Sequence, residues 1–275
     1  MSPTEWITVQ GRRIEYRWFD PEKALPGRPP IVMLHEGLGS VSMWKNFPEI
    51  LATVAEARVI AYSRFGYGNS DTLTARPVAT RMLEDEALQV LPEILHALSI
   101  QRPVLFGHSD GASIALIYAG THPDEVSGVI AMAPHVFVED MCIASIESAK
   151  QVYLETDLRD RLARYHRDPD GAFWQWNRLW LDPKFRAWNS EHFLRSIRCP
   201  LLVIQGYEDE YGTMEQLERI ARKVKLTETL KLPHCRHSPH RDQTAHVLAA
   251  ARRFMEERVY REPVDAQARR PLPSG

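Results

Sequence analysis

The segment Gly-His-Ser-Asp-Gly at residues 107–111 constrains the fold of this chain more than any other feature. The short apolar run before it, residues 103–106, is typical of a buried strand. The apolar stretch after it, residues 112–119, is typical of a helix that stops before Pro123. A strand that turns sharply into a helix leaves no room for side chains beside the turn, which favours the two glycines. Ser109 would then stand at the tip of the turn, where it is a candidate nucleophile.

Apolar runs and helical patterns alternate along the rest of the chain, which predicts an α/β fold with a mostly parallel sheet covered on both faces. A hairpin is expected first, with its turn at residues 10–12. The further strands are expected at residues 31–34, 58–62, 103–106, 129–133, 201–205 and 229–232, and the helices of this pattern at 44–54, 80–98, 112–119 and 244–257.

Residues 135–197 interrupt this alternation, since they contain no strand-like run. We expect a helical insertion that covers the carboxyl-terminal edge of the sheet, where sites in open α/β sheets lie. Most of its aromatic residues should form its own core, and one or two should face a pocket. Residues 1–134 and 198–260 would form the two parts of the core domain, and residues 261–275, rich in proline and arginine, are expected to be disordered.

A serine hydroxyl needs a base to take its proton and a carboxylate to orient that base. Two segments that follow predicted strands offer both, because the carboxyl ends of parallel strands meet at one edge of a sheet. In a fold with this turn, the partners follow in the order serine, acid, histidine. The candidate acids are Glu208, Asp209 and Glu210, and the candidate bases are His234, His237 and His240.

With residues 35–40, 62–70, 107–111, 206–209 and 237–240 taken together, the chain resembles the α/β-hydrolase superfamily over nearly its whole length. The resemblance implies an α/β-hydrolase fold with a helical cap after the sixth strand. It selects Asp209 as the acid, with Glu208 and Glu210 expected to be solvated. It favours His237 as the base over His240 and His234, although Arg236 stands where the family usually has glycine. His108, inside the motif, is expected to be structural.

The same resemblance implies an oxyanion hole built from two backbone N–H groups. One belongs to Asp110, the residue after the nucleophile, and the other to Gly37, with Leu38 as the alternative. Glu36 replaces a glycine that is usual in the family, and it would either stabilise the turn or contact substrate. We further expect substrate contacts from Leu38, Trp174 and Trp180.

Composition excludes several other classes of function. The net charge of −2 and the lack of a basic stripe predict no nucleic-acid partner. No apolar run approaches the roughly 18 residues of a membrane helix, and the first residues do not resemble a secretory signal. The three cysteines form no metal-binding spacing, so reduced thiols, a cytoplasmic location and no metal are expected. The expectation of a homodimer rests only on how common symmetric oligomers are.

The residue at the centre of the motif narrows the reaction. Haloalkane dehalogenases and epoxide hydrolases of this fold use an aspartate there, whereas this chain has Ser109, and the side chain of Asp110 is expected to point elsewhere. The resemblance therefore implies acyl transfer to water, without a cofactor, on a small carboxylic ester or lactone, with an aromatic or cyclic group suggested by the tryptophans. The alternatives are thioester hydrolysis, carbon–carbon bond hydrolysis, acyl transfer and perhydrolysis, or a small-molecule receptor without turnover.

Overall fold

An eight-stranded sheet runs through the computed structural model, which describes residues 3–72 and 79–260. The strand order is β1-β2-β4-β3-β5-β6-β7-β8, and all neighbours from β4 to β8 are parallel. The predicted hairpin forms the antiparallel edge of the sheet. The strands are β1 (Glu5–Val9), β2 (Arg12–Phe19), β3 (Ile31–Leu34), β4 (Val59–Tyr62), β5 (Val104–His108), β6 (Gly128–Met132), β7 (Leu201–Gly206) and β8 (Thr227–Leu232). The expected disorder of residues 261–275 falls outside the described residues.

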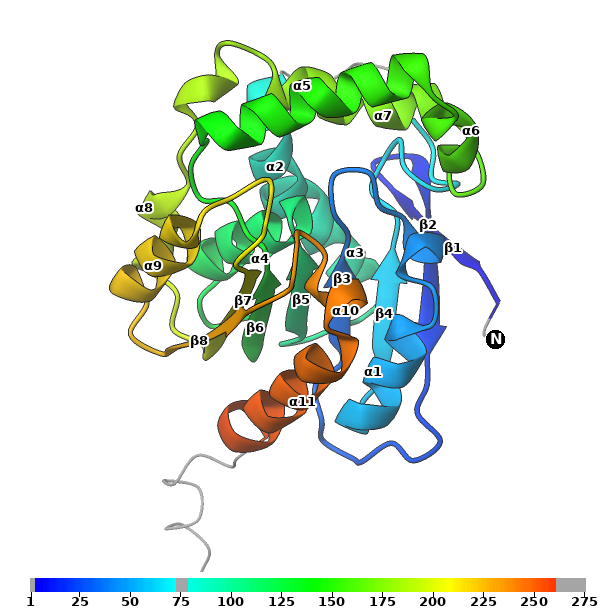
Figure 1. Cartoon of the computed structure of the whole chain (residues 1–275). Helices are drawn as coiled ribbons and strands as arrows, with labels where there is room; N and C mark the ends of the chain where they lie inside the picture. Colours follow the sequence, from blue (N-terminus) through cyan, green and yellow to red (C-terminus); the bar gives the residue numbers. More distant parts are fainter. Residues whose placement is uncertain (1–2, 73–78, 261–275) are drawn as a thin grey trace, which may run out of the picture.

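Successive residues of the central strands pack into two different hydrophobic cores, one on each face of the sheet, as the two-residue period of a strand requires. Ile31 and Met33 pack on the face covered by α1 (Phe47–Ala55) and α11 (Thr244–Phe254). Val32 and Leu34 pack on the opposite face, with α3 (Leu91–Ala97), α4 (Asp110–Thr121) and α9 (Met214–Lys223). The central strands are therefore buried on both sides, and α1 and α11 lie in front of the sheet in Figure 1.

The helix predicted at residues 80–98 is interrupted. It consists of a 3-10 turn (Ala79–Arg81), α2 (Met82–Asp85), a π-helical turn (Glu86–Val90) and α3. Pro92 in the first turn of α3 explains the interruption, because its ring displaces the carbonyl four residues earlier and it has no N–H to donate. The helix predicted at residues 44–54 begins only at Phe47, after a 3-10 turn (Val41–Trp44).

The regular structure between β6 and β7 consists of helices joined by loops, with one isolated bridge between Phe137 and Asn189. The helices between residues 140 and 180 lie across the top of Figure 1, over the end of the sheet from which β6 leads into them, whereas the short helix at residues 191–194 lies lower, beside α9. Their apolar side chains continue the core on the α4 side of the sheet, so the helical insertion is packed onto that core. The segment comprises α5 (Asp140–Glu155), α6 (Leu158–Leu162), α7 (Pro169–Trp180), a 3-10 turn (Phe185–Ala187) and α8 (Glu191–Leu194).

A buried histidine ties the insertion to two loops of the sheet. His166, between α6 and α7, accepts a hydrogen bond at Nδ1 from the amide of Gly68, at 2.9 Å. Its Nε2 donates to the carbonyl oxygen of Leu38, also at 2.9 Å. The two bonds require a neutral imidazole, and burial lowers the pKa of His166 accordingly.

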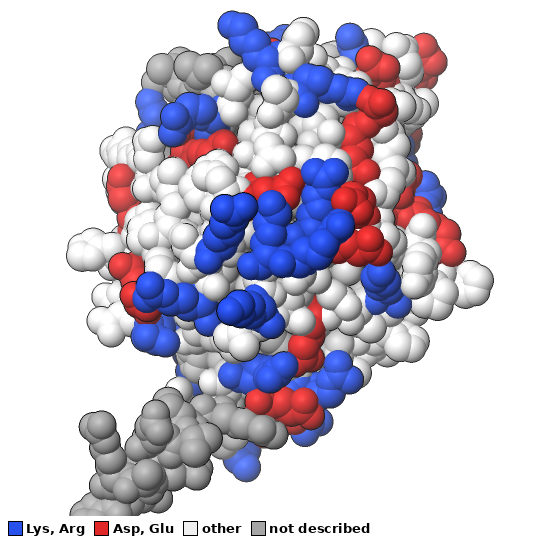
Figure 2. All heavy atoms as spheres, turned by 90° about the vertical axis from the view of Figure 1, so that its left-hand side faces the viewer, with Lys and Arg blue, Asp and Glu red and all other residues white. Residues whose placement is uncertain are grey.

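The surface beside α8, α9 and β8 carries mixed charge. Figure 2 shows basic side chains gathered in the middle of this face, with acidic side chains beside them. Arg219 pairs with Glu191 at 3.0 Å and with Glu215 at 2.9 Å. In the described part of the chain, no helix has the length and apolar character that a membrane span requires.

Candidate active site

Ser109 stands at the turn between β5 and α4, in a conformation that few residues adopt. Its φ of 53° and ψ of −119° place a non-glycine residue at positive φ, and tertiary packing must hold it there. The flanking glycines allow that packing by their small size. A Cβ on Gly107 would overlap the backbone of Gly111, and a Cβ on Gly111 would overlap the carbonyl oxygen of Leu34. The unfavourable backbone conformation is therefore that of Ser109, and the two glycines leave room for the tight turn around it.

Three predicted residues form one line of hydrogen bonds. Nε2 of His237 lies 2.9 Å from Oγ of Ser109, and Nδ1 of the same ring lies 2.8 Å from Oδ1 of Asp209. Asp209 follows β7 and His237 follows β8, so the parallel strands bring an acid and a base to the nucleophile from sites 100 and 128 residues away.

The electrostatics of this line favour an ion pair between Asp209 and His237. Burial alone would raise the pKa of Asp209, but the charge and hydrogen bond of His237 outweigh it and lower that pKa. Burial opposes protonation of His237 as well, yet the carboxylate of Asp209 raises the pKa of the imidazole above its ordinary value. Asp209 also accepts from the amide of Tyr211 at 2.9 Å, which helps to fix its carboxylate.

The carboxylates on either side of Asp209 accept hydrogen bonds from the backbone of residues 234–237, the loop that carries His237. Glu208 is exposed, as expected, but it accepts from the amides of His234 and Cys235. Glu210 is expected to be solvated, and its side chain is 35% exposed, but it also makes contacts within the site. Glu210 is half-buried, lines the cavity beside Ser109 and accepts from the amide of His237 at 3.2 Å.

The other candidate histidines do not contact Ser109. His234 lies exposed at the end of β8. His240 is buried against the rings of Trp44 and Phe47, at centroid distances of 4.9 and 5.5 Å. His108 donates from Nε2 to the carbonyl oxygen of His237 at 2.7 Å, so it helps to fix the backbone that carries His237.

The turn after β3 has one carbonyl that is held by three donors. The carbonyl oxygen of Glu36 accepts from Nη2 of Arg64 at 2.9 Å, from Nδ1 of His35 at 2.6 Å and from the amide of Gly39 at 3.0 Å. In a trans peptide the C=O and the next N–H point in opposite directions. The amide of Gly37 therefore points away from these three donors, and among the described residues it has no protein acceptor.

Gly37 must be a glycine because α7 lies directly on it. A Cβ at this position would overlap the indole ring of Trp176. The amide of Asp110 is similarly left without a helical partner, since it belongs to the first residue of α4. Two backbone donors, at Gly37 and Asp110, thus border the cavity that Ser109 also lines.

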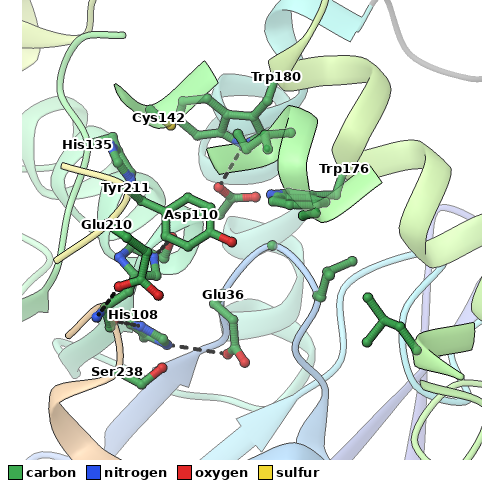
Figure 3. A pocket seen from close by; sticks show the side chains of 17 residues that line it. Glu36, His108, Asp110, His135, Cys142, Trp176, Trp180, Glu210, Tyr211 and Ser238 are labelled. Carbon is green, nitrogen blue, oxygen red and sulfur yellow. Dashed lines mark hydrogen bonds and ion pairs between the residues drawn. The ribbon is translucent and has the colours of Figure 1, made fainter. Parts of the chain in front are cut away.

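The Glu36 side chain both lines the cavity and stabilises the surrounding loops. Its carboxylate lies 3.5 Å from Nδ1 of His108 and 3.7 Å from Nη2 of Arg241, and Figure 3 shows the contact with His108. Burial raises the pKa of Glu36, but these neighbours and His240 hold it well below the ordinary value. The two roles considered for Glu36 are therefore compatible with one position.

The cavity around Ser109 has a volume of about 290 Å³ and one largely apolar side. Two tryptophans of α7, Trp176 and Trp180, lie one turn apart and both line it. Trp174 does not, which corrects the expectation of a substrate contact. Being two residues from Trp176, it lies on another face of α7, against Tyr153 and Phe173. The further lining residues on the apolar side include Leu38, Cys142, Ile146, Ala149 and Leu158.

The side chain of Asp110 lies in the wall of this same cavity, where it contacts α7 instead of standing at the position of the nucleophile. Figure 3 shows its carboxylate between Trp176 and Trp180. Oδ1 accepts from Nε1 of Trp180 at 3.1 Å, and Oδ2 lies 3.6 Å from Nη2 of Arg64. The helix that begins at Asp110 therefore turns this side chain toward α7.

Sequence reasoning also missed Arg64, His135 and Tyr211. Arg64 lies inside the quoted segment 62–70, but only the structure shows that its side chain reaches Glu36 and Asp110. His135 and Tyr211 line the cavity, and their rings pack near His237 at centroid distances of 5.9 and 4.6 Å. Burial lowers the pKa of His135 to about 3, so the ring is neutral.

Comparison with known proteins identifies a family and relatives that are similar to this chain in sequence. A family model described as "alpha/beta hydrolase fold" matches residues 29–179. A proline iminopeptidase from Heyndrickxia coagulans is 32% identical over 130 residues, which are 47% of this chain and only 42% of that protein. A 2-hydroxy-6-oxononadienedioate/2-hydroxy-6-oxononatrienedioate hydrolase from Paraburkholderia phymatum is 27% identical over 221 residues, covering 69% of this chain and 74% of that protein.

Solved structures show similarity of fold over most of the chain. A proline iminopeptidase from Mycobacterium smegmatis superposes with a TM-score of 0.78 at 16% identity, covering 93% of this chain and 98% of that one. An enol-lactonase from Burkholderia xenovorans LB400 gives a TM-score of 0.72 at 17% identity, covering 92% and 100%. Among the described residues, no group of three or more histidine, cysteine or acidic side chains could hold a metal ion.

Proposed function

The chain belongs to the alpha/beta hydrolase fold family, and from that premise we propose that it is a serine hydrolase acting on a small carboxylic ester or lactone. One observation carries the proposal, namely the continuous line of hydrogen bonds from Ser109 through His237 to Asp209. Each member of that line has the partner that acyl transfer requires of it.

In the first step, Oγ of Ser109 attacks the carbonyl carbon of the substrate and its proton passes to Nε2 of His237. The resulting imidazolium is stabilised by Asp209, 2.8 Å away at Nδ1. The negative charge on the carbonyl oxygen is stabilised by hydrogen bonds that the amides of Gly37 and Asp110 donate. Collapse of the intermediate breaks the bond to the alcohol oxygen, which takes the proton from His237, and a serine ester of the acid remains.

In the second step, water replaces the alcohol. His237 takes a proton from the water as its oxygen attacks the serine ester. The same two amides stabilise the second oxyanion, and the proton then returns to Oγ of Ser109 as the acid leaves. The positive φ of Ser109 holds Oγ at the tip of the turn throughout, so no rearrangement of the backbone is needed.

The charge of the cavity disfavours an anionic substrate. Its described lining includes three carboxylates, of Glu36, Asp110 and Glu210, and no lysine or arginine side chain. A dicarboxylate such as the one named for the relative from Paraburkholderia phymatum would meet like charge without a lining cation. The volume of about 290 Å³ is at the small end of ligand pockets, which suits a small ester or lactone.

A panel assay with an active-site probe tests this proposal. A fluorophosphonate should add one label to the wild type and none to Ser109→Ala, as measured by intact mass. The wild type should then hydrolyse short p-nitrophenyl esters and δ-valerolactone faster than a matched thioester, proline p-nitroanilide or a dienedioate. Equal labelling of both proteins would refute the role of Ser109, and faster cleavage of the anilide or dienedioate would refute the substrate class.

A further inference from the structure

A carboxylate oxygen without a hydrogen bond lies in the wall of the cavity. Asp110 is only 1% exposed, and Oδ1 is satisfied by Nε1 of Trp180 at 3.1 Å. Oδ2 has no hydrogen-bond partner. Such a buried acceptor is costly for the fold unless something satisfies it, and this makes it a candidate for ligand recognition.

The nearest cation does not satisfy this oxygen. Nη2 of Arg64 lies 3.6 Å from Oδ2, which is beyond hydrogen-bond distance, and it already donates to the carbonyl oxygen of Glu36 at 2.9 Å. Arg64 therefore balances the charge of Asp110 without a hydrogen bond to Oδ2. Figure 3 shows the carboxylate directed into the space between Trp176 and Trp180.

We propose that Oδ2 of Asp110 accepts a hydrogen bond from a hydroxyl group of the substrate, so that the preferred ester or lactone is a hydroxylated one. This inference rests on the proposed function and deepens it, because it names a group that the substrate carries. A hydroxyl fits better than an ammonium group, since Arg64 already balances the charge of the carboxylate.

Burial supports the same assignment. It raises the pKa of Asp110, although Arg64 and Trp180 oppose that shift. A hydroxyl group that donates to Oδ2 would help to keep the carboxylate ionised. A substrate without the hydroxyl would leave the oxygen buried and unpaired, and a site built in this way discriminates strongly against the analogue that lacks the donor.

The test uses two matched pairs of probes, phenyl 3-hydroxybutyrate with phenyl butyrate, and α-hydroxy-γ-butyrolactone with γ-butyrolactone. For the wild type we expect kcat/KM at least tenfold higher for the hydroxylated member of one pair or both. Asp110→Asn should reduce this preference to within about twofold, because it replaces the acceptor at the Oδ2 position by an NH₂ donor while its own carbonyl can still accept from Trp180. Equal kcat/KM for both members of both pairs would overturn the inference.

A matched control separates recognition from packing. Trp180→Phe removes the donor to Oδ1 and keeps an aromatic ring, so it should preserve the preference for the hydroxylated member. Loss of the preference in Trp180→Phe to the same extent as in Asp110→Asn would show that Asp110 acts only through the position of Trp180, and would also overturn the inference.

Binding to Ser109→Ala separates the inference from the proposed function. NMR titration of this variant with the same pairs measures affinity without turnover. At least tenfold tighter binding of a hydroxylated member supports recognition by Asp110, even where the wild type hydrolyses neither probe and the proposed function fails. Equal binding within both pairs overturns the inference, even where hydrolysis is fast.

Discussion

Nη2 of Arg64 donates to the carbonyl oxygen of Glu36 at 2.9 Å, and this contact fixes the orientation of the peptide that joins Glu36 to Gly37. The ring of His35 holds the same oxygen from Nδ1, while its Nε2 accepts from the amide of Arg64 at 3.0 Å. His35 and Arg64 are thus hydrogen-bonded to each other and to the carbonyl oxygen of Glu36. A backbone donor at Gly37 can be preorganised only if the opposite end of its peptide is held in this way.

Loss of the Arg64 side chain should therefore reduce the rate more than it reduces substrate affinity. For Arg64→Met we expect kcat to fall about tenfold or more, less than the roughly 10²–10³-fold measured for loss of an oxyanion donor itself, with a smaller change in KM. Steady-state kinetics on a short p-nitrophenyl ester measures both constants.

The Arg64 variant also leaves Asp110 without its balancing charge, so its fold needs a control. In the double variant Arg64→Met/Asp110→Asn the carboxylate of Asp110 is removed together with its cation, and thermal unfolding should return part of the way toward that of the wild type, since Glu86 still lacks the charge of Arg64. The low kcat should persist in this double variant. Full recovery of kcat there would show that Arg64 serves charge balance and does not position the turn.

The pH dependence of the reaction should follow His237. This ring must be neutral to accept the proton of Ser109, and Asp209 raises its pKa above the ordinary value of 6.5. We expect kcat/KM to be low where the ring is protonated and to rise with pH through a midpoint above 6.5. In Asp209→Asn the midpoint should move to lower pH and the plateau should fall by up to about 10⁴-fold. A profile that is flat from pH 5 to 9 would contradict the role of His237.

Much of the site could be predicted because its parts follow from chain order. The motif around Ser109 marks one strand end, and Asp209 and His237 each come shortly after another, so a parallel sheet brings them together. The sequence could not show which face of α7 lines the cavity. It predicts a substrate contact at Trp174, whereas Trp176 is the residue in the lining. The same limit hid the contacts of Arg64, which depend on a buried side chain crossing between loops.

Two glycines of the site should respond differently to a methyl group. In Gly111→Ala the new Cβ would overlap backbone atoms of Leu34 and His35, which the sheet holds in place. In Gly37→Ala it would overlap the ring of Trp176, which can move. We expect Gly111→Ala to lower the free energy of unfolding by about 1–3 kcal/mol or more, as overpacking does, and Gly37→Ala to lower it less.

The catalytic effect of Gly37→Ala tests the contact with α7. Addition of Trp176→Ala removes the overlapping ring, so the double variant should regain part of the kcat that Gly37→Ala loses. Urea unfolding and ester hydrolysis on the wild type and the three variants measure both effects. An equal loss of stability in Gly37→Ala and Gly111→Ala would contradict the distinction between a movable side chain and a fixed backbone.

His166 should make the attachment of the helical insertion sensitive to acid. The ring accepts from Gly68 and donates to Leu38, an arrangement that only the neutral form allows. Burial lowers its pKa below 6.5, so the folded chain binds fewer protons here than the unfolded chain does. The contribution of His166 to stability is therefore complete above pH 6.5 and is lost as the pH falls through that value toward the folded pKa.

Comparison of the wild type with His166→Gln separates this effect from that of other buried histidines. His35, His135 and His240 also have lowered pKa values, and they remain in both proteins. The free energy of unfolding in urea should therefore fall between pH 7.5 and 5.5 in both proteins, but by a smaller amount in the variant. An identical fall in the two proteins would mean that the neutral form of His166 contributes nothing to the attachment of the insertion.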